Sequence, residues 1–158
     1  MMLTYRLVHL IETHSDALAH GLLSKVQESP HTRDYCRNVP SDELKQRVYE
    51  IYRHLGEWLV GSSAGDVAER YMQIGARRAR QEVPLSQLIW AIILTKENLW
   101  EYILNESSPD RVVEIFGKQE LLQLLDKFFD QAIYFAAVGH ERAMEETVKK
   151  QTPIHPAA

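Results

Sequence analysis

The fold is decided by the stretch PLSQLIWAIIL, residues 84–94, which ends in seven consecutive apolar residues. The β-branched residues in this run would also suit a strand. The apolar pattern, however, continues at helical spacing through Leu99, Trp100 and Ile103. A helix that is apolar on all sides is buried on all sides. We therefore predict a central helix from about Pro84 to Glu106, in which proline suits the first turn.

Amphipathic stripes before this central helix predict three more helices. The first, Leu3–Gln27, is followed by a proline-containing segment, residues 29–40, that we expect to be a loop. Ser41 suits the N-cap of the second helix. The small residues of 61–65 separate this helix from a third, which we expect to open at Asp66.

The C-terminal part predicts a short helix from Ser108 to about Gly117 and a last helix from about Lys118 to Lys150. The apolar residues of the last helix follow alternating steps of four and three, so this seam can pack against the domain or against a partner helix. After Gly139 charged residues predominate, and we expect this end to project. The seam, assigned to a dimer or output helix, consists of Leu121, Leu125, Phe128, Ala132 and Phe135.

Together these patterns predict an all-α, single-domain bundle of about five to six helices with a long projecting C-terminal helix. A length of 158 residues fits one domain. We place the helical domain at residues 1–150 and expect a disordered tail at 151–158, where two prolines occur. A globin-like arrangement of the helices stays open as an alternative.

Composition excludes several classes of protein. A net charge of −4 lacks the basic surplus of a nucleic-acid binder. A single cysteine, Cys36, rules out an internal disulfide and a cysteine-based zinc site, and it favours a reducing, cytoplasmic compartment. A membrane span needs about 20 apolar residues, whereas the longest apolar run has seven, Leu88–Leu94.

One catalytic motif occurs, around Ser63. The sequence GSSAG, residues 61–65, matches the G-x-S-x-G nucleophile elbow of serine hydrolases. That elbow requires a strand-to-helix turn, whereas here the preceding segment is predicted to be a helix. A turn of small residues between helices explains the motif, so we predict no enzyme and no catalytic residue. A Ser63-dependent hydrolase is retained as an alternative.

The seven histidines do not form a metal-binding pattern, because the two E-x-x-H pairs of a di-iron bundle and the H-E-x-x-H motif are both missing. His14, His54 and His140 fall on predicted helices, where each is a candidate axial ligand for haem. A histidine with an ordinary hydrogen bond is the competing explanation. We therefore predict no cofactor and no metal, and we keep a haem- or small-ligand-binding sensor as an alternative.

Two further groups suggest a binding site. Tyr71, Trp90 and Trp100 are candidates for lining a ligand pocket, although aromatic residues at helical spacing also form ordinary core. The third predicted helix carries a basic cluster, which we interpret as an ion-paired, solvated face offset by nearby glutamates. Arg78 lies nearer the buried boundary and is expected to pair with a carboxylate or to cap carbonyls. The cluster consists of Arg70, Arg77, Arg78 and Arg80, offset by Glu69 and Glu82, with Glu97 as a further candidate partner.

The stretch ARRARQEVPLSQL, residues 76–88, resembles the signature of the RsbRD-type N-terminal domain, a family named for bacterial stress-response co-antagonists. That signature has an Arg-Ala pair, a short polar step and a Val-Pro-Leu-Ser-like helix start. The segments LIETH, residues 10–14, and LLDKFFD, residues 124–130, also fit the family. The likeness covers most of residues 5–145.

The resemblance implies a non-catalytic bacterial signal-input (sensor) domain that is helical and forms homodimers. Such domains precede an output module, such as a histidine kinase or a STAS-type domain, and the family supplies no catalytic residues to carry over. Because no output domain follows the last helix, we expect either a stand-alone member or a domain cut from a longer protein. Our hypothesis is that the last helix passes the signal to the partner.

Overall fold

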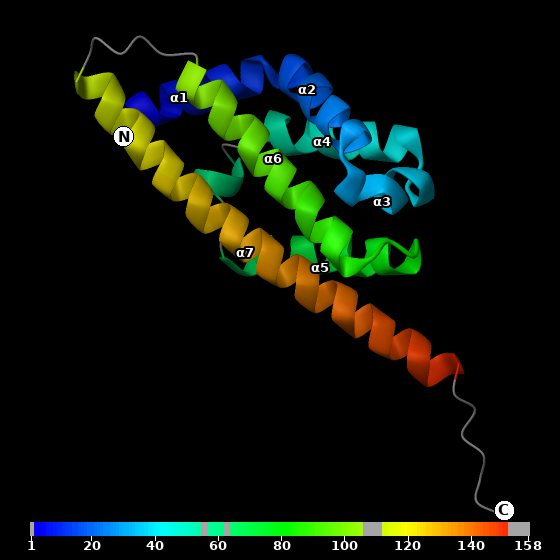
Figure 1. Cartoon of the computed structure of the whole chain (residues 1–158). Helices are drawn as coiled ribbons and strands as arrows, with labels where there is room; N and C mark the ends of the chain where they lie inside the picture. The colour runs from blue at the N-terminus through cyan, green and yellow to red at the C-terminus, as the bar shows by residue number, and fades with distance from the viewer. Residues whose placement is uncertain (1, 55–56, 62–63, 106–111, 152–158) are drawn as a thin grey trace, which may run out of the picture.

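The predicted central helix is α6, Leu85–Asn105, in the computed structural model of the chain. It begins directly after Pro84, as predicted, and packs against α2 and α7 (Figure 1). Its burial is less complete than its composition predicts. Leu88 and Leu99 are fully buried, whereas Ile89 and Ile93 on the other side are half-buried. The helix therefore lies in the body with one face only partly covered.

The structure describes residues 2–54, 57–61, 64–105 and 112–151, and it contains no strand in these ranges. The chain is all-helical. Of the predicted tail, residues 151–158, Gln151 is the last residue of α7 and residues 152–158 lie outside the described residues. No helix in the described ranges has the length and apolarity to cross a bilayer. Besides α6, the elements are α1 (Met2–Thr13), α2 (Ser15–Glu28), the short turn η1 (Pro30–Thr32), α3 (Arg33–Asn38), α4 (Ser41–Arg53), the π-turn η2 (Glu57–Gly61), α5 (Ala64–Arg80) and α7 (Val112–Gln151).

The prediction of one continuous first helix is wrong, because the segment breaks at His14 into α1 and α2. The His14 backbone leaves the helical region, at φ −99° and ψ 22°, and its ring Nδ1 donates to the Leu10 carbonyl at 2.9 Å. The break lets the apolar stripes of both helices reach one core, in which Ile11 and Leu22 are each 1% exposed.

The predicted loop at residues 29–40 is also wrong, because this segment forms η1 and α3. The Ser29 hydroxyl accepts from the His31 amide at 3.2 Å and so caps the turn. Side-chain caps of this kind replace missing helical hydrogen bonds. Ser41 is not an N-cap, because α4 starts at Ser41 and Pro40 precedes it in the cap position.

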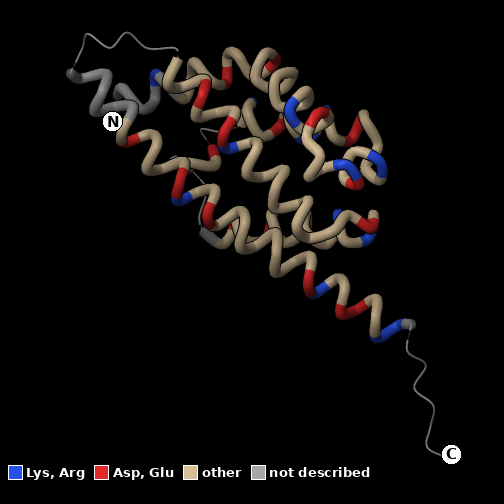
Figure 2. The backbone as a smooth tube through the Cα atoms, in the orientation of Figure 1, with Lys and Arg blue, Asp and Glu red and all other residues tan. Residues whose placement is uncertain are grey.

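The C-terminal part forms a single helix where we predicted two. α7 runs unbroken from Val112 to Gln151, through Gly117. An isolated glycine costs a helix only about 1 kcal/mol, which packing of the rest of α7 against the body offsets. The far end of α7 extends beyond the body (Figure 1), and Figure 2 shows acidic and basic positions alternating along it. The predicted projection is thereby confirmed.

Helices α5 and α7 make the most extensive helix pair in the fold. Two glycines allow their backbones to touch. A Cβ at Gly75 would overlap the Ala136 carbonyl oxygen of α7, and a Cβ at Gly139 would overlap the Met72 carbonyl oxygen of α5. Small residues thus fix the separation of these helices, because any side chain at either position would force them apart.

We predict that Gly75→Ala or Gly139→Ala destabilises the fold by about 1–3 kcal/mol, the usual range for overpacking. Urea unfolding followed by circular dichroism measures the loss. Gly21→Ala in α2 is the matched control, because its added Cβ would lie 3.3 Å from one side-chain atom, Asn98 Oδ1, and would not overlap any backbone atom. The control should lose less stability than either α5–α7 variant. Unchanged stability in the two α5–α7 variants would contradict the close contact.

Candidate functional site

Arg78, near the end of α5, is a fully buried charge. Its Nε donates to the Tyr35 hydroxyl of α3 at 2.9 Å, and its Nη1 donates to Glu43 of α4 and to Gln81 Oε1, each at 2.7 Å. The guanidinium also lies over the Tyr35 ring, 5.3 Å from the ring centroid. One side chain therefore joins α3, α4 and α5, and the predicted pairing of Arg78 with a carboxylate is confirmed.

Glu43 is the anion of this network. It lies in the first turn of α4 and accepts hydrogen bonds from Arg77, Arg78 and Gln81. The hydrogen bond from Arg77 is the largest cause, and those with Arg78 add to it, so the pKa of Glu43 falls to about 2 despite the opposing effect of burial. Burial raises the pKa of Tyr35, although Arg78 opposes the shift. Glu43 therefore stays ionised and Tyr35 stays neutral at physiological pH.

The turn between α5 and α6 closes over Arg78. The Val83 amide donates to the Arg78 carbonyl and the Glu82 amide to the Ala79 carbonyl, each at 3.0 Å. This is the Schellman pattern of a helix C-terminus, which requires a left-handed residue. Glu82 takes that conformation at φ 62°, in the position where glycine is usual. Its carbonyl accepts from Asn38 Nδ2 at 3.0 Å, which ties the turn to α3.

His140 of α7 reaches the same turn. It is 6% exposed, and its Nε2 donates to the Val83 carbonyl at 2.7 Å. On the other side of the turn, Gln87 of α6 accepts from the Tyr35 amide and donates to Asp34, so α3 is also bound to α6. The stretch 76–88 is thus the junction at which five helices meet.

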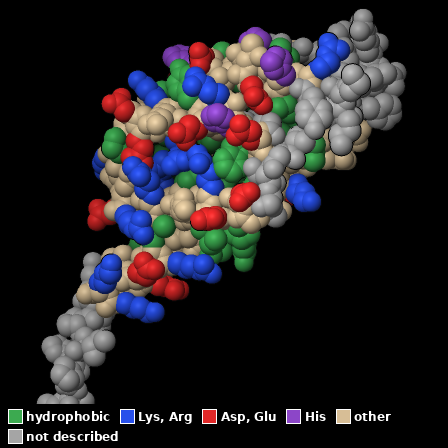
Figure 3. All heavy atoms as spheres, turned by 180° about the vertical axis from the view of Figure 1, so that it is seen from behind, with side chains coloured by type: hydrophobic (Ala, Val, Ile, Leu, Met, Phe, Trp, Pro, Cys, Tyr) green, Lys and Arg blue, Asp and Glu red, His purple; other side chains and the backbone are tan. Residues whose placement is uncertain are grey.

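Two of the other cluster arginines, Arg70 and Arg77, are ion-paired as predicted but with different partners, whereas Arg80 has no ion pair among the described residues. Arg77 pairs with Glu43, and Arg70 pairs with Glu50 at 2.9 Å. Both carboxylates belong to α4 rather than to the neighbourhood of the cluster in the sequence, and Glu97 is an exposed residue of α6. Figure 3 shows Lys and Arg side chains gathered in the middle of one face, with acidic side chains around them.

The three aromatic residues proposed for a pocket have different neighbours. Tyr71 is buried edge-on to Phe128, with ring centroids 5.8 Å apart. The ring centroids of Trp90 and His31 are 4.9 Å apart, and the Lys96 Nζ lies 5.8 Å from the Trp100 ring centroid. A shared ligand pocket for these residues stays a prediction.

The three candidate haem ligands lie on separate elements. His14 is exposed at the α1–α2 break, and His54 is exposed at the end of α4, 3.6 Å from Glu57. Only His140 is buried, and a carbonyl occupies its Nε2. Within the described ranges no three His, Cys, Asp or Glu side chains gather as metal ligands. Ser63 lies outside the described residues, and the described elements that flank it are helical.

The predicted seam of α7 packs against the chain itself. Four of its residues are in the hydrophobic core and the fifth is partly buried against it. The seam therefore holds α7 on the body, and its assignment to a dimer or output helix stays a prediction. The buried residues are Leu121, Leu125, Phe128 and Ala132, and the partly buried residue is Phe135.

We predict that Arg78→Met destabilises the protein by about 3–5 kcal/mol, because it leaves a carboxylate without its buried partner. Arg77→Met is the matched control, since it removes a largely exposed arginine from the same carboxylate. Exposed ion pairs contribute little to stability, because water and salt screen them. Chemical denaturation of both variants gives the two values, and equal losses would show that burial of Arg78 is energetically unimportant.

The low pKa of Glu43 predicts a pH dependence of stability. A carboxyl group whose folded pKa is depressed stabilises the fold above its unfolded pKa, near 4.5, and loses this effect as the pH falls toward 2. Wild type should therefore exceed Glu43→Gln in unfolding free energy at pH 7, and the difference should shrink below about pH 4.5. Urea titrations at several pH values test this, and a constant difference would contradict the assignment.

Comparison with known proteins gives one match. The family model described as the RsbT co-antagonist protein rsbRD N-terminal domain matches residues 16–152, which is most of the chain and includes the whole junction around Arg78. Searches of curated proteins and of solved structures found no match. The chain therefore belongs to the family of the RsbT co-antagonist protein rsbRD N-terminal domain, and it is a signalling input domain.

Proposed function

We propose that this chain is a non-catalytic, cytoplasmic sensor domain that self-associates and passes a signal through α7 to an output partner. The observation that carries the proposal is α7 itself, a 40-residue helix with one part held in the core and a charged end extending past the body (Figure 2). A helix of this kind transmits any displacement of the body along its length. Shifts of about 1–2 Å at helix interfaces are a common switching motion.

The two faces of α7 support this division of roles. The core residues, such as Leu125 and Ala136, share one face. The exposed apolar residues Tyr134, Met144 and Val148 are 63%, 45% and 57% exposed. At about 100° per residue, these three fall within a single stripe on the opposite side of the helix. Apolar residues four apart, such as Met144 and Val148, can pair helices in coiled coils. We therefore assign this stripe, which Glu141 interrupts, to the α7 of a second copy.

The body and α7 are coupled at two points. At the two glycines the backbones of α5 and α7 are in contact, so α5 cannot move toward α7 without displacing it. The His140 bond to the Val83 carbonyl connects α7 to the turn that Arg78 supports. A change in the buried network would therefore reach α7 within two contacts. The ionised Glu43 accepts hydrogen bonds from Arg77, Arg78 and Gln81 and so acts as a structural anion, which supports a non-catalytic role.

The family description names a co-antagonist of RsbT. We infer that the output partner is a module of a bacterial signalling pathway, either a STAS-type domain or a histidine kinase, that meets the projecting end of α7. The haem- and Ser63-based alternatives have no described contact in their favour.

We predict that Met144→Glu or Val148→Glu weakens self-association at least about tenfold, because each substitution places a charge within the apolar stripe. Light scattering coupled to size-exclusion chromatography measures the mass over a concentration series. Helical circular dichroism should be unchanged, since both positions are exposed. Substitution of Phe128 would be uninformative here, because that residue belongs to the core.

Lys150→Glu is the matched control, because it makes the same end of α7 more negative from outside the stripe. It should leave the mass unchanged. A wild-type protein that stays monomeric at millimolar concentration would contradict self-association. A dimer that is indifferent to both stripe variants would place the interface elsewhere.

A further inference from the structure

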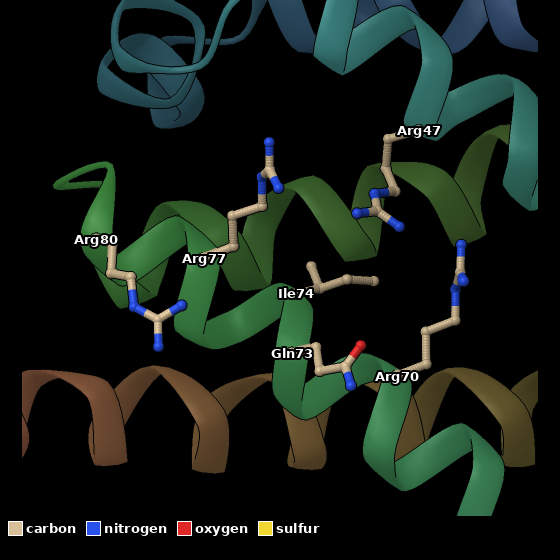
Figure 4. Close-up of a pocket in the computed structure, with 6 residues that line it drawn as sticks. All are labelled: Arg47, Arg70, Gln73, Ile74, Arg77 and Arg80. Atoms are coloured by element: carbon tan, nitrogen blue, oxygen red, sulfur yellow. The ribbon is translucent and has the colours of Figure 1, made fainter.

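A polar cleft separates α4 from α5 on the side of α5 away from α7. Its volume is about 290 Å³. Figure 4 shows that Arg47 reaches down from α4, whereas the other lining residues follow one face of α5, with Ile74 between them. The lining consists of Arg47, Arg70, Gln73, Ile74, Arg77 and Arg80.

The cleft has an excess of positive charge. Four arginines line it, and the carboxylates that pair with them are two, Glu43 and Glu50. Glu50 is shared by Arg70 at 2.9 Å and Arg47 at 3.6 Å, and Glu43 is already shared with the buried Arg78.

Two of the arginines, Arg80 and Arg47, show the excess of positive charge most clearly. Arg80, at the far end of the row in Figure 4, has no ion-pair partner among the described residues. Burial, followed by repulsion from Arg70, lowers the pKa of Arg47. This direction is the one expected where cations crowd together.

We propose that this cleft binds the phosphate group of a small phosphorylated molecule. Arginine presents a planar fork of five donors that matches phosphate oxygens in bidentate pairs. Arg70 donates from Nη2 to Glu50, and Arg77 donates from Nε to Glu43. The other N–H groups of each guanidinium can therefore bind a phosphate while the ion pair is kept. The Gln73 amide and the Ile74 side chain are placed to contact the organic part of the ligand.

Binding in the cleft can also affect α7, and this part of the inference rests on the proposed function. A phosphate on Arg77 would compete with Glu43, which is held by Arg78 at the α5–α6 junction. The same junction carries the Val83 carbonyl bonded to His140 of α7. Ligand binding on one side of α5 is thereby coupled to the helix packed on its other side, and the class of signal becomes a phosphorylated metabolite.

The test is calorimetric titration of the full 158-residue chain with inorganic phosphate and with ribose 5-phosphate at a fixed chloride concentration. We expect saturable binding, tighter for ribose 5-phosphate. Arg80→Gln should weaken it about tenfold, the loss expected for a charge-assisted hydrogen bond. Arg6→Gln on α1 is the matched control for charge, and it should change the affinity less than about twofold.

A second variant gives an effect of opposite sign. Glu50→Gln removes the competing carboxylate from Arg47 and Arg70, so it should tighten binding about threefold or more, whereas a loss of folding would weaken it. Circular dichroism verifies the fold of each variant. Binding of free phosphate as tight as that of ribose 5-phosphate would identify the inorganic ion as the ligand and overturn the assignment of a phosphorylated molecule.

Two results would overturn the site altogether. One is a lack of saturable heat with either probe, and the other is equal affinity in wild type and Arg80→Gln. If a phosphoserine peptide binds saturably and the two small probes do not, the ligand is a phosphorylated protein, and the assignment of a small molecule is overturned. Binding with no effect on the mass of the α7 assembly would contradict only the coupling. Assembly through α7 without phosphate binding would contradict only this site.

Discussion

The buried ion pair between Arg78 and Glu43 is the interaction on which the rest of the structure depends. A guanidinium removed from water is expensive unless its charge is matched and its donors are used. Arg78 matches its charge with Glu43 and uses Nε and Nη1 on groups from α3, α4 and the α5–α6 turn, so those elements must all be in place for the charge to be tolerated. Its buried Nη2 has no hydrogen-bond partner among the described residues. Such an interaction contributes more to the choice of one arrangement of helices than to net stability.

The second constraint is the backbone contact between α5 and α7. Gly75 and Gly139 bring the two helices so close that neither can slide without moving the other. The bond from His140 to the Val83 carbonyl adds a polar connection at the point where α5 ends. A body joined in this way to a long helix is suited to passing small displacements outward. Under the proposed function, the residues that would relay a signal are therefore also the residues that hold the fold together.

The two sides of α5 have different chemistry. The side toward α7 is made of small and apolar residues, whereas the side toward α4 carries arginines that outnumber their carboxylate partners. Arg78 and Glu43 lie at the boundary between these sides. A charged ligand at the arginine cleft and the position of α7 would thus be linked through one helix, which gives the family's signature stretch a physical role.

By itself, the sequence determined the all-helical class, the position of α6, the helical stripes and the family, because these follow from periodicity and from a contiguous motif. It also placed Arg78 near the core, with either a carboxylate or helix carbonyls as its expected partner. Tertiary structure alone decided which carboxylate that is, since Glu43 lies 35 residues away on another helix. It likewise decided the break at His14, the helical form of residues 30–38 and the continuity of α7. Local propensity is nearly balanced at these positions, so the choice falls to packing between segments that are distant in the sequence.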